Sequence, residues 1–121
     1  MTGEEVLAKA IKLLGYTNNQ GNVELTQRVR SSATENINII YADLSKIEEK
    51  NFKPITSLDQ KIDLPDIVMY DCFVYGLAMN IARSEYDTDN QREFAILYNS
   101  KRLSLSKTAK RIDVIPGSCD L

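Results

Sequence analysis

The residues of this chain best suited to chemistry form a basic cluster near its C-terminal end. The cluster consists of Lys101, Arg102, Lys107, Lys110 and Arg111. The last three share one face if the segment is helical, because steps of three and four residues align on a helix. Such a cluster can bind phosphates with an affinity that is independent of base sequence and falls with salt. A solvated helix face is the simpler interpretation, since no aromatic residue lies among these bases to stack on nucleobases.

Acid–base chemistry has two candidates, Asp71 and Tyr75, inside an apolar stretch from Leu64 to Ala82. For Asp71, a hydrogen-bonded or rim position is the simpler interpretation, because structural networks also perturb acids. The chain has no histidine, which removes the commonest general base and metal ligand. Its two cysteines, Cys72 and Cys119, lack the spacing of a zinc site or a disulfide scaffold. The sequence therefore predicts a protein that is not an enzyme, with no metal and no cofactor.

The apolar stretch itself predicts the central helix of the fold. Between residues 67 and 82 only Asp71, Gly76 and Asn80 fall outside the apolar set, so the helix is expected to be buried on nearly every side. Its short length and its internal acids argue against a membrane span. Pro65 suits the start of the helix. Gly76 in its middle predicts the close approach of another backbone.

Two further helices are predicted before the central one. Thr2 and Glu5 have the spacing of a capping box, and Gly15 is placed to end the first helix in a left-handed conformation. From Leu25 to Ile47 apolar residues follow at steps of three and four, which predicts one continuous helix about six turns long. Residues 50–63 break this pattern and predict a packed loop with a short strand or turn.

The chain after residue 85 predicts one more helix and then a strand. Thr88 and Gln91 have capping-box spacing, and the short connection makes an antiparallel hairpin with the central helix. The segment Arg111–Ile115 alternates like a strand and ends at a proline. A lone strand needs a partner, which would be the loop before the central helix or another subunit. The candidate residues for subunit pairing are Ile112, Val114 and Ile115.

Length and charge complete the predicted organisation. The 121 residues fit a single domain, expected in a reducing, intracellular environment. Residues 61–88 carry a net charge of −3 and residues 89–111 a net charge of +4, although the whole chain carries only −2. This asymmetry indicates contact with something charged. The predicted fold class is mainly α, a bundle of about four helices with a buried central helix, plus a short C-terminal strand or tail over residues 106–121.

The second half of the chain carries a family resemblance. Its residues are Tyr75, Gly76, Ala78, Asp89, Gln91, Phe94, Tyr98 and Asn99, followed by the segment 111–116. This pattern resembles the head–tail connector, or adaptor, proteins of tailed bacteriophages and prophages. The resemblance covers roughly the last 55 residues, and the first 60 agree in helical pattern and total length.

The resemblance implies a structural protein of the virion neck, present in the host cytoplasm during assembly. Family members form a ring, commonly of twelve subunits, that docks beneath the portal protein and continues the DNA channel. The ring receives the next neck or stopper protein, lies near packaged DNA and contacts no membrane. A monomer in isolation is compatible with this role, because such rings can form only once the subunits meet the portal. By residue, the turn at Tyr98–Arg102 and the basic tail would face the channel or portal, and Arg111–Ile115 would pair between subunits.

The sequence is also compatible with a second function. The net charge of +4 over residues 89–111 is also compatible with a small helical regulatory protein that binds nucleic acid through the basic segment 101–111. The slightly acidic chain as a whole departs from a strongly basic channel lining. DNA affinity measured against salt distinguishes the two functions.

Overall fold

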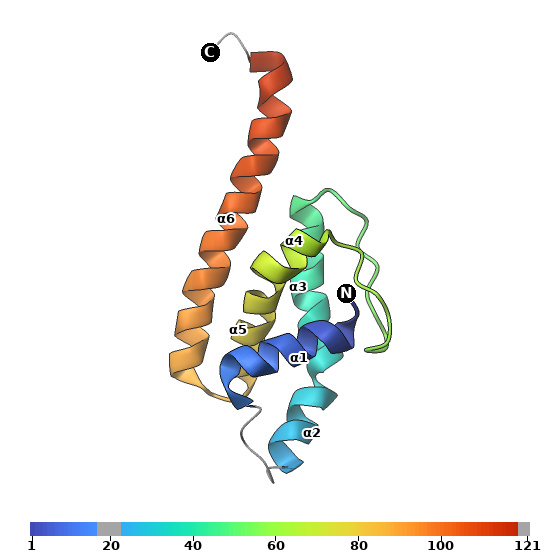
Figure 1. The fold of residues 1–121 in the computed structure, drawn as a ribbon, viewed down its shortest axis with the longest axis vertical. Coiled ribbons are helices and arrows are strands. Elements are labelled where there is room, and N and C mark those ends of the chain that lie inside the picture. Colours follow the sequence, from blue (N-terminus) through green and yellow to red (C-terminus); the bar gives the residue numbers. More distant parts are fainter. Residues whose placement is uncertain (17–22, 119–121) are drawn as a thin grey trace.

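The computed structural model of the chain describes residues 1–16 and 23–118, with side chains described for 1–16 and 27–105. The helices are α1 (Gly3–Leu14), α2 (Val23–Ser31), α3 (Ala33–Ile47), α4 (Asp66–Val68), the π-helical turn η2 (Met69–Phe73), α5 (Val74–Ser84) and α6 (Thr88–Ser118). No strand occurs among the described residues, so the predicted small helical bundle is confirmed (Figure 1).

Helix α1 begins and ends as its sequence predicts. The capping box between Thr2 and Glu5 is present, and Gly15 ends the helix with a left-handed φ of 78°. The loop of residues 48–65 lies against the N-terminal end of α1, where the carbonyls of Leu58 and Gln60 accept hydrogen bonds from the first amides of the helix at 2.9 and 3.1 Å. These carbonyls satisfy donors that have no partner inside the helix.

The single helix predicted from Leu25 to Ile47 is wrong, because the chain breaks it at Ser32 into α2 and α3. The hydroxyls of Ser31 and Ser32 both donate to the carbonyl of Arg28, each at 3.0 Å. Serine side chains compete with backbone amides for helix carbonyls and so favour a bend. The apolar period survives the break, since buried residues occur on both sides of it.

The central helix is confirmed, but it contains a π turn that the sequence did not predict. Helices α4 and α5 are joined through η2, and a π turn accommodates one extra residue in an α-helix. Met69 and Phe73 are buried on one side of this turn, whereas Ile67 and Tyr70 are 71% and 56% exposed on the other. The helix is therefore buried along most of its length and open at its N-terminal end.

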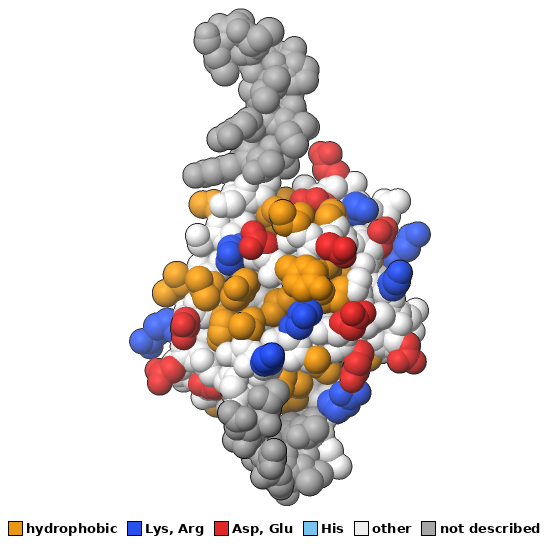
Figure 2. Space-filling model, viewed as in Figure 1, with side chains coloured by type: hydrophobic (Ala, Val, Ile, Leu, Met, Phe, Trp, Pro, Cys, Tyr) orange, Lys and Arg blue, Asp and Glu red, His pale blue; other side chains and the backbone are white. Residues whose placement is uncertain are grey.

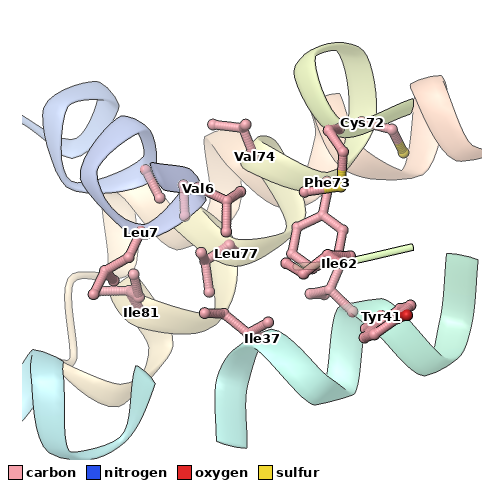
Figure 3. Close-up of a cluster of buried hydrophobic side chains, with 14 of the residues drawn as sticks. Val6, Leu7, Ile37, Tyr41, Ile62, Cys72, Phe73, Val74, Leu77 and Ile81 are labelled. Carbon is pink, nitrogen blue, oxygen red and sulfur yellow. The ribbon is translucent and has the colours of Figure 1, made fainter. Parts of the chain in front are cut away.

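The core lies between α1, α3 and the central helix. In Figure 3 the side chains of Leu7, Ile37, Leu77 and Ile81 approach one another from these three elements. Each of the four is at most 1% exposed. Burial of a large aliphatic side chain contributes about 1.5–3 kcal/mol, so this convergence holds α5 in the middle of the bundle.

Helices α5 and α6 form the predicted antiparallel hairpin (Figure 1). The cap differs from the prediction, since Asp87 rather than Thr88 precedes the helix. The Asp87 carboxylate accepts a hydrogen bond from the Asn90 amide at 3.4 Å, and its carbonyl accepts one from the Gln91 amide at 2.9 Å. An aspartate at this position satisfies free amides of the first turn.

The strand predicted at Arg111–Ile115 is wrong, because α6 continues to Ser118. Extending an existing helix needs no new nucleus, whereas a lone strand needs a partner to pair with. The backbone of Ile112, Val114 and Ile115 is thus helical, and the predicted pairing of strands between subunits does not fit this geometry. The last turns of α6 extend beyond the other helices (Figure 1).

Candidate interaction surface

Four residues of the family-like pattern meet where α5 packs on α6, and we call them the seam residues. They are Tyr75, Gly76, Phe94 and Tyr98. The rings of Tyr75 and Phe94 stack with centroids 6.2 Å apart and an interplanar angle of 29°. Phe94 and Tyr98 are buried. The pattern therefore marks one packed interface inside the hairpin.

Gly76 gives the seam its closest contact. A Cβ atom at this position would lie 2.7 Å from Cε1 of Tyr98 and 3.0 Å from Cδ1 of Ile40. The close approach predicted for Gly76 is real, but the prediction that a backbone makes it is wrong. The ring of Tyr98 occupies the space instead.

Tyr98 is held in place by a charged cluster that we call the Asp43 clasp. The Tyr98 hydroxyl donates to Oδ2 of Asp43 at 2.7 Å. The guanidinium of Arg102 donates to the same carboxylate through Nε at 2.6 Å and Nη2 at 2.8 Å. Bidentate pairs of this kind combine charge with fixed geometry. The clasp therefore fastens α6 to α3.

The clasp shifts the pKa of its own members. The hydrogen bond from Arg102 lowers the pKa of Asp43 below its usual value, and the hydrogen bond from Tyr98 acts in the same direction against the effect of burial. Burial and the bond to Asp43 raise the pKa of Tyr98. Asp43 therefore remains a carboxylate at neutral pH, as a bidentate pair requires.

Lys101, another base of the predicted cluster, also has partners within the fold. Lys101 Nζ lies 3.4 Å from Oδ1 of Asp71 and 5.2 Å from the centre of the Tyr75 ring. Asp71 is 66% exposed in this pair, so it occupies the rim position that the sequence favours. Two of the five bases of the predicted cluster thus contact carboxylates of the same chain.

The other predicted residues do not converge on one place. Ala78 is buried, Gln91 is half-buried, and Asp89 and Asn99 are exposed on α6. The side chains of the remaining bases and of the predicted pairing residues lie outside the described part. These are Lys107, Lys110, Arg111, Ile112, Val114 and Ile115.

The two acid–base candidates each have a structural partner in the fold. Asp71 is exposed and Tyr75 stacks on Phe94. The nearby Cys72 is buried, and burial raises the pKa of its thiol to about 12, so it is not a thiolate nucleophile. In this part of the chain, no three metal-ligating side chains are close enough to hold an ion. No described helix has the length and apolar character needed to cross a membrane.

The surface of the described residues carries several large apolar side chains. On the face drawn in Figure 2 they form patches among charged side chains. Large apolar residues that are exposed include Leu13, Ile39, Phe52, Ile67, Tyr70, Tyr86, Ile96 and Leu103. Apolar surface bordered by charges is typical of protein–protein contacts.

Tyr86 differs from the others in its backbone. It has a φ of +57° in the turn between α5 and α6. Its amide donates to the Arg83 carbonyl at 3.2 Å, and the Asp87 amide donates to the Ala82 carbonyl at 2.8 Å. This is the Schellman pattern, in which glycine is the usual residue at the left-handed position. A residue with a side chain there costs about 1–2 kcal/mol, yet the Tyr86 side chain is 91% exposed.

Sequence reasoning missed Asp43 and Tyr86 for different reasons. Asp43 lies 59 positions from its partner Arg102, and no local pattern links residues so far apart. Tyr86 does carry a local signal, since an aromatic residue stands where a helix end usually has glycine.

Comparison with protein-family models, curated proteins and solved structures finds no match for this chain.

Proposed function

We propose that this protein is a head–tail connector subunit of a tailed bacteriophage or prophage. The observation that carries the proposal is the convergence of the seam residues at the α5–α6 interface. These four residues belong to the pattern that resembles the connector family. Their close packing gives that pattern a physical role, since each residue shapes the hairpin.

The surface of the chain supports a role in assembly. Exposed apolar side chains occur on several elements, and the last turns of α6 extend beyond the bundle (Figure 1). A ring is built from head-to-tail contacts, in which one patch of a subunit meets a different patch on its neighbour. A projecting helix and separate apolar patches suit such contacts.

The charge distribution favours the connector over the nucleic-acid-binding regulator. Lys101 and Arg102 already contact Asp71 and Asp43. Freeing them for phosphate would leave these carboxylates without their cations. Nucleic-acid binding through the segment 101–111 would therefore depend on the other three bases of the cluster, Lys107, Lys110 and Arg111.

The proposal is tested by mixing the purified chain with the portal ring encoded by the same genome. Mass photometry and electron microscopy then report whether several copies bind coaxially beneath the portal. A monomer in the absence of portal agrees with the proposal, because the portal provides the template. If the chain never binds the portal while the neck of the particle is complete without it, the proposal is wrong.

A further inference from the structure

We infer that Tyr86 is an anchor that inserts into an apolar pocket, rimmed by lysine or arginine, on a neighbouring neck protein. This inference rests on the proposed function and assigns a contact residue within it. Tyr86 combines high exposure with a strained backbone. A strained residue persists where the surroundings over-determine its conformation, and such positions cluster at functional sites.

The turn around Tyr86 is fixed on both sides. Before it, the Glu85 carboxylate accepts hydrogen bonds from Arg28 at 2.8 and 3.3 Å. After it, the Asp87 carboxylate accepts hydrogen bonds from the Tyr16 hydroxyl at 2.8 Å and from Asn90 Nδ2 at 2.7 Å. The flanking side chains are thus tied to the protein while the ring between them points into solvent. Preorganisation of this kind lowers the entropic cost of binding.

The same chain provides a comparison for this position. Glu49 is exposed and left-handed as well, with a φ of +56°. Its turn has the same pair of hydrogen bonds, from the Lys50 amide to the Ser45 carbonyl at 2.9 Å and from the Glu49 amide to the Lys46 carbonyl at 3.4 Å. A charged side chain there keeps a helix end hydrated. An exposed aromatic ring has no such role, whereas tyrosine is among the residues enriched at binding hot spots.

Charge around the ring selects the class of partner. Residues 83–93 contain four acidic and two basic side chains. Glu85 pairs with Arg28, whereas the acids Asp89 and Glu93 are exposed on the first turns of α6. Carboxylates repel the phosphates of nucleic acid and of anionic lipid. They suit a protein pocket with a basic rim. The hairpin turn also lies at the end of the bundle opposite the free end of α6 (Figure 1), so it can contact a second protein while α6 contacts a first.

The test compares full-length variants in binding to two purified probes, the portal ring and the next neck protein of the same genome. Tyr86→Gly removes the ring and relieves the strain, so we expect a melting temperature a few degrees higher and affinity for one probe at least about tenfold lower. Tyr86→Phe should bind like the wild type. Glu49→Gly is the matched control, expected to raise the melting temperature and leave both affinities unchanged.

Each other outcome contradicts the inference in an identifiable way. Unchanged affinity of Tyr86→Gly for both probes would remove the anchor while leaving the proposed function intact. Wild-type chain that binds neither probe would contradict the function and the anchor together. A lower melting temperature for Tyr86→Gly would assign the ring to the fold instead. Loss of self-association, or of binding to single-stranded DNA or anionic phosphatidylserine vesicles, would assign it to a partner other than a neck protein.

Discussion

At the residue scale, the hairpin depends on how Gly76, Tyr98 and Asp43 fit together. Gly76 leaves room for the Tyr98 ring, and Asp43 holds the hydroxyl at the far end of that ring at 2.7 Å. Arg102 completes the cluster from the next turn of α6. The glycine is therefore needed for the space it leaves rather than for its backbone freedom.

Replacing Gly76 by alanine should destabilise the protein, although alanine is the better helix former by about 1 kcal/mol. The new Cβ would lie 2.7 Å from the Tyr98 ring, and overpacking of this kind costs about 1–3 kcal/mol. Gly76→Leu should cost more. Urea unfolding of both variants measures the effect. In a Tyr98→Leu background the cost of Gly76→Ala should shrink, and an equal cost in both backgrounds would show that the ring is not the obstacle.

Stability in acid should depend on Asp43. Because Arg102 lowers the pKa of Asp43 in the folded state, this carboxylate stabilises the fold above its unfolded pKa of about 3.9. That contribution is lost as the pH falls through the lowered folded pKa. Asp43→Asn should therefore lose less stability than the wild type between about pH 5 and pH 2.

Denaturant unfolding at a series of pH values measures this difference. Asp59→Asn, in the exposed part of the 48–65 loop, provides a control that should follow the wild type. Parallel pH curves for Asp43→Asn and the wild type would show that the clasp does not stabilise the folded state through its charge.

At the element scale, the sequence predicts what local patterns control. The capping box of Thr2 and Glu5, the left-handed Gly15 and the apolar stretch of the central helix all reflect neighbours within a few residues. The break at Ser32 escaped prediction because the apolar period continues through it. The helical course of residues 111–115 escaped because two-residue alternation predicts a strand, while the preceding helix only had to continue. In the Asp43 clasp, Asp43 and Arg102 are 59 positions apart in the sequence, so no local pattern links them.

The π turn η2 should allow the central helix to tolerate the deletion of one residue. Deleting Asp71 should convert the turn to ordinary α-helix, because the turn holds one residue more than an α-helix would. The faces of α4 and α5 then stay in place, and the loss is limited to the exposed pair with Lys101. Deleting Met79, within α5, should instead rotate every later residue by about 100°.

Circular dichroism melts compare the two deletions. We expect the Asp71 deletion to melt cooperatively within several degrees of the wild type and the Met79 deletion to lack a cooperative transition. Equal damage from both deletions would contradict this interpretation of η2.

At the scale of the whole molecule, the chain combines a packed helical bundle with apolar surface and a projecting helix end. Several of its charges are paired within the described residues, since Arg28, Arg30, Lys50, Lys101 and Arg102 each contact a carboxylate of the same chain. The overall charge of −2 gives little long-range attraction for a polyanion. This distribution agrees with the proposed role in contacts between proteins.

DNA binding should accordingly be weak. We expect any affinity for duplex DNA at about 50 mM salt to be lost by about 200 mM, as it is when a few phosphate contacts carry the binding. Fluorescence anisotropy with two duplexes of unrelated sequence measures both salt dependence and selectivity. Tight, sequence-selective binding at the higher salt would favour the regulatory function over the connector.

The connector function is tested most directly by electron cryo-microscopy of the neck in particles produced by the same genome. The connector function predicts a ring of this chain coaxial with the portal, with the turn of the α5–α6 hairpin against a neighbouring neck protein. A complete neck built entirely from other proteins would contradict it.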